Sequence, residues 1–308
     1  MSVRETSFEY LPPEEAFLDP ERADSAHPDR AKAVVVPFGL EATVSYGGGT
    51  AGGPAAILAA SHQLEVFDEE LWRAPVDDFG IATLTPLDTT GPIEAALGRL
   101  AATVEQVLES GRFPLVLGGE HSLTAGAINP FAASYRDLMV LQIDAHADLR
   151  DGYLGERYSH ASAMRRVLDH EHVGLVSVGI RAICEEEAEF IEANRERVHV
   201  HWGRGQARWD IERIVAPLAG RPIYVTFDVD GLDAAVMPAT GTPMPGGLAF
   251  LDALAILRRA AEVGTIVGGD VVELAPIPGL HFCDFTAAQI AYKLMTYALS
   301  GTRSRRLR

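Results

Sequence analysis

Thiols are scarce in this chain, whose 308 residues include only two cysteines, Cys184 and Cys283. So few cysteines form no disulfide framework, and we expect a reducing compartment, the cytoplasm. The first residues, M-S-V-R-E-T-S-F-E-Y-L, contain no apolar run after the charged positions, so we expect no secretory signal. No stretch approaches the roughly eighteen consecutive apolar residues of a membrane-spanning helix, so we expect none.

Basic residues are also few, because 26 Lys and Arg face 43 Asp and Glu, for a net charge of −17. This balance argues against nucleic acid or an anionic membrane as a partner. It is compatible with a small cationic substrate, although a merely soluble acidic surface accounts for it more simply. The glycine-rich stretch 41–53 lacks the G-K-[ST] ending of a P-loop and the G-x-G-x-x-G spacing, so we do not interpret it as a phosphate-binding loop.

Strand-like and helix-like segments alternate from residue 31 onward. The predicted strands are 31–37, 79–84, 113–117, 139–143, 173–180, 198–202, 222–229 and 265–272, with 65–71 as a short strand or turn. The predicted helices are 54–61, 91–111, 123–134, 159–168, 184–194, 210–218, 249–262 and 284–299. This alternation predicts a single α/β domain over 31–308, a three-layer α/β/α arrangement with a mainly parallel sheet. Residues 1–30 are expected to form an irregular N-terminal arm, and the basic tail 303–308 to be solvated.

The most informative stretch is 139–150, which reads M-V-L-Q-I-D-A-H-A-D-L-R. Its apolar start predicts a buried parallel strand. Asp144, His146 and Asp148 then follow at alternate positions, and alternate side chains of an extended chain point the same way. They can therefore converge just past the carboxyl end of the strand, where open α/β sheets keep their active sites. A polar turn that happens to contain a histidine would explain one aspartate, but not three convergent ligands.

Two further strands end in the same kind of residue. The strand F-P-L-V-L leads into G-G-E-H-S, which contains His121, and P-I-Y-V-T-F-D-V ends at Asp228 with Asp230 close behind. Taken singly, such a histidine is more often structural, and such an aspartate can simply cap a helix. Together, the candidate metal ligands are His121, Asp144, His146, Asp148, Asp228 and Asp230.

Two histidines and four aspartates are too many ligands for one ion and suit two. A carboxylate-rich set without thiolate favours Mn²⁺ or a related ion over structural Zn²⁺. Two such ions, about 3.5–4 Å apart, can activate a water molecule at neutral pH. The predicted chemistry is therefore metal-dependent hydrolysis.

Three motifs also carry a family resemblance: G-G-E-H-S at 118–122, D-A-H-A-D at 144–148, and T-F-D-V-D-G-L-D-A-A-V-M-P-A-T-G-T-P-M-P-G-G at 226–247. Over roughly residues 31–300 the chain resembles the ureohydrolases, the family of arginases, agmatinases and related guanidino hydrolases. The resemblance implies an arginase-like fold, two Mn²⁺ per subunit on the six ligands, and a homotrimer or homohexamer. Residues 31–308 would then be the ureohydrolase catalytic domain.

The resemblance also assigns roles around the metals. It implies that Glu273 holds the substrate guanidinium, that His160 is a catalytic proton shuttle, and that Thr242 lies beside the guanidinium. A carboxylate can accept two parallel N–H bonds from a guanidinium, and a histidine can protonate a departing amine. Without the family, Glu273 could equally be an exposed strand end and His160 a surface residue of a helix. The loop that carries Thr242 could place it elsewhere.

Three positions differ from the arginase pattern, in which they help to bind an α-amino acid. Arg150 stands where arginases have asparagine, Glu156 where they have serine, and Cys184 where they have aspartate. The chain therefore looks most like an agmatinase, which converts agmatine and water to putrescine and urea. The alternatives are another guanidino or formimino hydrolase of the guanidinobutyrase, arginase or formiminoglutamase type, with Arg150 meeting a substrate carboxylate, and a non-catalytic relative, against which the six ligands argue.

Overall fold

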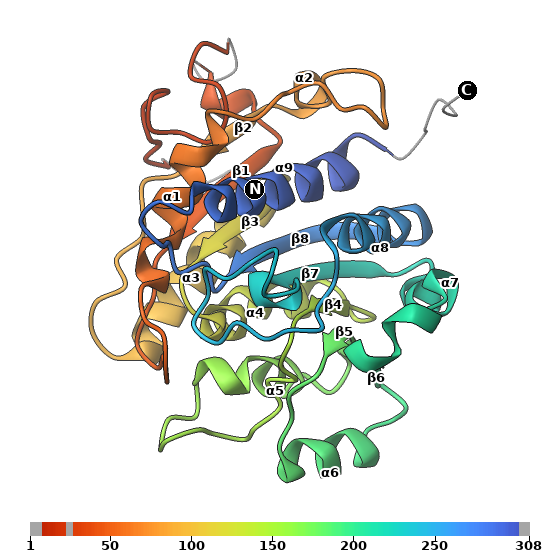
Figure 1. Cartoon of the computed structure of the whole chain (residues 1–308). Coiled ribbons are helices and arrows are strands. Elements are labelled where there is room, and N and C mark those ends of the chain that lie inside the picture. The colour runs from red at the N-terminus through yellow and green to blue at the C-terminus, as the bar shows by residue number, and fades with distance from the viewer. Residues whose placement is uncertain (1–7, 23–26, 302–308) are drawn as a thin grey trace.

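A parallel β-sheet forms the centre of the computed structural model, which describes residues 8–22 and 27–301 (Figure 1). Its strands are β1 (Ala33–Phe38), β2 (Ile81–Thr83), β3 (Phe113–Gly118), β4 (Met139–Ile143), β5 (Gly174–Ile180), β6 (Val198–Trp202), β7 (Pro222–Asp228) and β8 (Thr265–Val272). They form one eight-stranded sheet in the order β2-β1-β3-β8-β7-β4-β5-β6. Every neighbouring pair is parallel, so all the carboxyl ends lie along one edge.

Helices cover both faces of the sheet, as the predicted three-layer α/β fold requires (Figure 1). They are α1 (Gly53–Ser61), α2 (Val76–Phe79), α3 (Ile93–Glu109), α4 (Thr124–Ser134), α5 (Ala163–Val167), α6 (Glu185–Ala193), α7 (Ile211–Val215), α8 (Phe250–Val263) and α9 (His281–Leu299). Residues of α1, α7, α8 and α9 enter one hydrophobic cluster, and residues of α3, α4, α5 and α6 enter the other. Within β1, Val35 belongs to the first cluster and Val34 and Val36 to the second, which explains why both faces of this strand are apolar.

A few elements differ from the sequence-based expectation. The predicted strand at 79–84 begins at Ile81, because Phe79 ends the short helix α2 and Gly80 turns the chain at a φ of 61°. Residues 65–71 form no regular strand, and a single bridge joins Asp68 to Arg73. The helix expected over 159–168 is divided into a 3₁₀ turn, His160–Ser162, and α5.

The N-terminal segment packs on the edge of the sheet and on α1. Phe17 and Leu18 are buried, and their backbone N–H groups donate to Thr83 Oγ1 at 2.9 Å and Ser61 Oγ at 2.7 Å. The predicted solvation of the tail 303–308 lies outside the described residues, as do residues 1–7 and 23–26 of the predicted arm. Among the helices that the structure describes, none is long and apolar enough to cross a membrane.

The sheet order determines where the site can form. Strands β3, β8, β7 and β4 are consecutive neighbours in the middle of the sheet. The segments that follow these four strands therefore meet over its central carboxyl edge, although they come from distant parts of the sequence. This is the position at which parallel α/β sheets bind ligands.

Candidate active site

The structure brings the six predicted ligands together at this edge. His121 starts a 3₁₀ turn after β3, Asp144 directly follows β4, and Asp228 is the last residue of β7. The side chains form two groups that could each hold a metal ion, His121 with Asp144 and Asp148, and Asp144 with His146 and Asp230. Within each group the ligand atoms lie within 4.8 Å of one another, and Asp144 belongs to both.

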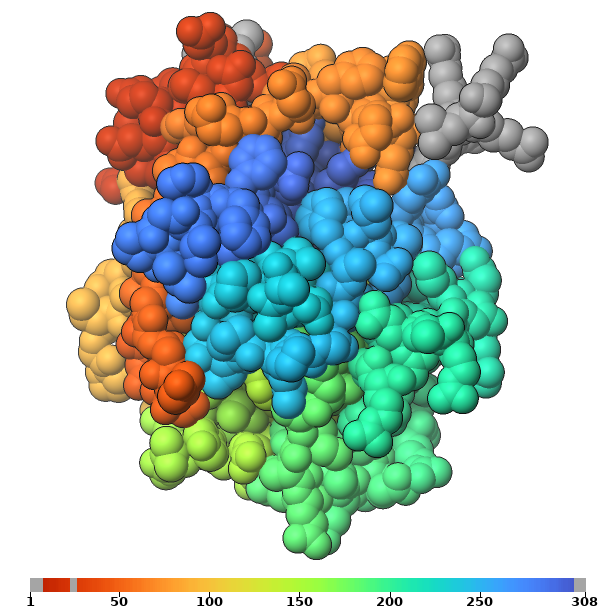
Figure 2. Space-filling model, viewed as in Figure 1, coloured from red at the N-terminus to blue at the C-terminus, as the bar shows by residue number. Residues whose placement is uncertain are grey.

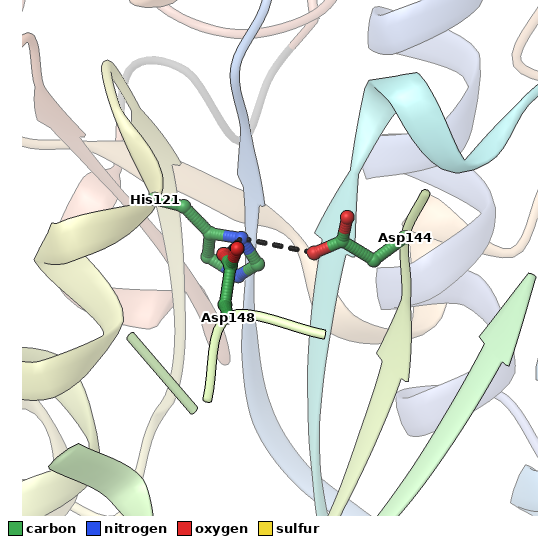
Figure 3. Close-up of side chains that lie close together, drawn as sticks. All are labelled: His121, Asp144 and Asp148. Carbon is green, nitrogen blue, oxygen red and sulfur yellow. Dashed lines mark ion pairs between the residues drawn. The ribbon is translucent and has the colours of Figure 1, made fainter. Parts of the chain in front are cut away.

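His121 is the centre of the first group. Its Nδ1 lies 3.1 Å from Asp144 Oδ2, 2.9 Å from Asp148 Oδ2 and 3.3 Å from Asp228 Oδ2 (Figure 3 shows the first two carboxylates). Asp228, which is in neither group, thus faces the first one. The Nδ1 atom is buried, and no described residue, these carboxylates included, forms a hydrogen bond with it in acceptable geometry.

The other ring nitrogen of His121 identifies the role of Nδ1. Nε2 lies 2.8 Å from Thr226 Oγ1, and the Thr226 hydroxyl donates its hydrogen to Asp270 Oδ1 at 2.6 Å. Thr226 must therefore accept a hydrogen from Nε2, which leaves the Nδ1 lone pair facing three carboxylates in a neutral ring. Although burial opposes it, the carboxylates raise the pKa of His121, so a positive charge belongs between these groups, and either a proton on Nδ1 or a metal ion supplies it. A metal ion fits this arrangement, and the carboxylate-backed imidazole is the usual support of a metal-binding histidine.

The second group is built around His146. Its Nδ1 lies 3.0 Å from Asp230 Oδ2 and 3.7 Å from Asp144 Oδ1. The two oxygens of Asp144 thus face different histidines, as expected of a carboxylate shared by two ions. Backbone N–H groups fix these aspartates: His146 N donates to Asp144 Oδ1 at 2.6 Å, and Ala145 N donates to Asp230 Oδ1 at 2.9 Å.

The pKa values reflect this crowding of buried charge. Burial, followed by the nearby carboxylates of Asp148 and Asp230, raises the pKa of Asp144 to about 7. Although burial opposes it, the Asp230 carboxylate raises the pKa of His146 to about 10. The site therefore attracts positive charge, either protons or metal ions. An oxygen-rich donor set with two imidazoles and no thiolate fits divalent ions of the Mn²⁺ kind.

Glu273 lies directly beside the first group. Its Oε1 accepts a hydrogen bond from His121 N at 2.6 Å, and its own backbone N donates to Gly119 O at 2.8 Å. Burial raises the pKa of Glu273 to about 8. Glu273 and Asp148 have φ angles of 65° and 53°, in the left-handed region that residues other than glycine seldom adopt. Such conformations cluster at active sites, where the surrounding contacts hold them in place.

A cavity of about 200 Å³ opens onto the ligands. The three residues assigned to substrate by resemblance, His160, Thr242 and Glu273, all line it, as do His146, Asp148, Asp228 and Asp230. Its walls also include Ser45, Tyr46, Arg150, Tyr153 and Ile183. Figure 2 shows the segments that supply these walls, the loop near residue 45, the loop after β4 and the loop after β7, meeting on one side of the molecule.

Sequence reasoning did not find two polar residues that contact the cavity wall from behind, Thr43 and Glu120. Glu120 is fully buried, and Thr43 contacts both Glu120 and His160. Glu120 could have been noticed in the sequence, because it is a charged residue directly before the candidate ligand His121. Thr43 lies in the glycine-rich stretch that we considered only as a phosphate loop, so its hydroxyl carried no signal of its own.

Comparisons with known proteins agree with the geometry. The profile of the Arginase family matches residues 31–297. The chain belongs to this family, and the predicted resemblance is confirmed.

More specifically, it is a ureohydrolase with agmatinase-type relatives, an enzyme that hydrolyses guanidino C–N bonds. It is 39% identical over 292 residues to an N(1)-aminopropylagmatine ureohydrolase of Synechocystis, covering 91% of this chain and 93% of that one. It is 35% identical over 254 residues to an agmatinase of Bacillus subtilis, covering 81% and 85%.

A solved structure, the agmatine ureohydrolase of Thermoplasma volcanium, superposes with a TM-score of 0.80 at 30% identity, covering 90% of this chain and 93% of that one. The predicted single-domain, arginase-like fold is therefore confirmed.

Proposed function

We propose that this enzyme hydrolyses a guanidino compound whose far end is an amine, with agmatine as the first candidate, giving putrescine and urea. The observation that carries the proposal is the pair of ligand groups sharing Asp144 beneath a cavity that also contains Glu273 and His160. The relatives named agmatinase and N(1)-aminopropylagmatine ureohydrolase support an amine-ended substrate and add the aminopropyl derivative as a member of the same class.

The proposed cofactor is a pair of Mn²⁺ ions. His121, Asp148 and Asp228 would hold one ion, His146 and Asp230 the other, and Asp144 would contact both. When bound, two such ions lower the pKa of a water molecule so that it can attack the guanidinium carbon at neutral pH. The orphaned Nδ1 of His121 is the feature of this chain that best fits the first ion.

Glu273 is proposed to orient the guanidinium. Its Oε1 already accepts from His121 N, while no hydrogen bond among the described residues reaches Oε2, which therefore can accept an N–H of the substrate. A charge-assisted bond of this kind is directional as well as strong. Thr242 lies in the same cavity wall, within the proposed substrate site. His160, which also lines this cavity, is proposed to give a proton to the departing amine.

Arg150 is the observation that favours a second candidate. Its guanidinium lies 4.9 Å from the ring centroid of Tyr153 in the cavity wall. Asp151 pairs instead with Arg166 at 2.7 Å, and Glu156 accepts from Tyr158 N at 2.9 Å. Within the described part of the chain, no acidic side chain forms an ion pair with Arg150. An unneutralised cation here would attract an acid-ended substrate such as guanidinobutyrate.

A urea-release assay with added Mn²⁺ tests these candidates. We expect agmatine or N(1)-aminopropylagmatine to have a kcat/KM at least about tenfold above that of arginine, because the three arginase-type recognition positions differ and an unmatched charged group costs about 1.4 kcal/mol or more. Arginine at or above the amines would refute the amine-ended class. Guanidinobutyrate as the best substrate would establish the second candidate instead.

The cellular setting of the enzyme is likewise proposed. A cytoplasmic enzyme that makes putrescine would serve polyamine biosynthesis, and the family resemblance implies a homotrimer or homohexamer. Light scattering on the purified chain measures the assembly, and a monomer at micromolar concentration would contradict it.

A further inference from the structure

We propose that Glu120, acting through the Thr43 hydroxyl, fixes the tautomer and the ring orientation of His160. Thr43 and Glu120 are positioning residues in this proposal. The catalytic role of His160 rests on the proposed function. The tautomer of His160 does not, because the hydrogen-bond contacts define it.

Counting hydrogens around Thr43 Oγ1 gives the tautomer. Three partners surround this oxygen: Glu120 Oε1 at 2.8 Å, the backbone N of His160 at 2.9 Å and His160 Nδ1 at 3.0 Å. The carboxylate can only accept, so it takes the single hydroxyl hydrogen, and the two lone pairs of Oγ1 remain for His160. Nδ1 must therefore carry a hydrogen and donate it to Thr43.

Glu120 is held too firmly to release that hydrogen bond. Its side chain is fully buried, and Oε2 accepts from Ala42 N at 2.7 Å and Thr43 N at 2.6 Å. Its Oε1 accepts from Ser122 Oγ at 2.6 Å as well as from Thr43. One carboxylate thus joins the cavity-wall loop to the end of β3, the segment that carries His121.

The consequence for His160 concerns its second nitrogen. With Nδ1 bonded to Thr43, Nε2 of the neutral ring keeps its lone pair, and Ser45 Oγ lies 3.5 Å from it. Ser159 Oγ also lies 3.5 Å from Nδ1, a marginal distance beside the 3.0 Å contact of Thr43. His160 lines the cavity, so Nε2 is the atom that can take up a proton and later give it to the departing amine nitrogen. Once protonated, the ring keeps its Nδ1–H on Thr43, with the Glu120 carboxylate behind it.

The test compares Thr43→Val, which removes the hydroxyl, with Thr43→Ser, which keeps it. We expect Thr43→Val to lower kcat by roughly 10- to 100-fold with KM nearly unchanged, and Thr43→Ser to restore most of the loss. The matched control is Thr50→Val, because Thr50 Oγ1 donates to Glu41 Oε2 at 3.2 Å and no hydrogen bond among the described residues joins it to His160. Bound Mn²⁺ and melting temperature are measured for all three variants. Equal losses in Thr43→Val and Thr50→Val would overturn the proposal.

A double-mutant cycle with His160→Ala separates positioning from general damage to the loop. If Thr43 acts through His160, adding Thr43→Val to His160→Ala lowers kcat no further. A further tenfold loss in the double variant would show that Thr43 acts by another route and would overturn the proposal.

A neutron structure of the Mn²⁺-loaded wild-type enzyme gives a readout that does not depend on turnover. Deuterium on His160 Nδ1 and a Thr43 hydroxyl directed at Glu120 are expected, and a bare Nδ1 would overturn the assignment. A wild-type enzyme that releases no urea from any guanidino compound would refute the proposed function, while this structure would still decide the tautomer.

Discussion

The two histidines of the candidate metal centre differ in their access to the cavity. His121 is 1% exposed, and its ring is braced from behind by Thr226 and Asp270. The side chain of His146 is 31% exposed and lines the cavity. His121 is thus fixed by the interior of the protein, whereas His146 opens onto the cavity that Asp148, Asp228 and Asp230 also line. Asp144, which faces both histidines, is the element that couples them.

Removing Asp144 breaks the coupling and has the largest expected effect. Asp144→Ala should reduce urea release to background and lower bound Mn²⁺ at both positions, because one carboxylate faces both groups. Asp230→Ala should also abolish activity but spare metal binding on the His121 side. Metal analysis by mass spectrometry checks both variants. No more than one ion per chain in the fully active wild type would rule out the two-metal centre.

Glu273→Gln tests the substrate side of the site beside His121. Losing a charge-assisted hydrogen bond costs about 1.5–3 kcal/mol, so we expect kcat/KM for the best substrate to fall roughly 10- to 100-fold. The amide can still accept from His121 N, so bound Mn²⁺ should match the wild type. Near-normal kinetics would remove Glu273 from the substrate site.

Thr226→Val sharpens the comparison between the two histidines. The variant removes the acceptor of the His121 Nε2 hydrogen, and we expect the affinity for one ion to fall by about 10-fold or somewhat more. The affinity on the His146 side should change little. Thr296→Val is the control, because the hydroxyl of Thr296 is buried, has no hydrogen-bond partner in the described part of the chain, and belongs to α9, outside the candidate site. An equal loss of affinity for both ions, or no loss for either, would contradict the proposal that Thr226 supports only the His121 side.

Arg150→Ala probes the cavity wall and has the smallest expected effect. A partly exposed charge contributes about 0.2–1 kcal/mol, so the substitution should change relative rates only by a few-fold. We expect kcat/KM to rise for agmatine and to fall for guanidinobutyrate, as measured in parallel urea-release assays. A fall for agmatine would show that Arg150 helps to bind the amine-ended substrate.

The candidate site also shows which features could be predicted from the sequence and which could not. Asp144, His146 and Asp148 could be found because a parallel sheet brings the residues after its strands to one edge, so their meeting point follows from strand order alone. The sharing of Asp144 between two histidines could not be found in this way, since it depends on the direction of each carboxylate oxygen.

The bracing contacts were not predictable for a related reason. Thr43 and Glu120 are 77 residues apart in the sequence, and their contact requires a loop to fold back onto the end of β3. The prediction of one continuous helix over 159–168 was wrong, because His160–Ser162 form a 3₁₀ turn with Ser159 as the N-cap. That turn is what presents His160 to the cavity wall, a local departure that hydrophobic periodicity does not encode.

The location of Asp144 and His121 at the ends of central strands has an evolutionary consequence. These residues are anchored to the sheet, whereas Tyr46, Arg150 and Tyr153 belong to loops that meet around the cavity mouth. Substitutions in those loops can change the shape and charge of the entrance without moving the reactive centre. A lineage with this architecture can therefore acquire a new substrate through a handful of surface changes and keep its hydrolytic chemistry throughout.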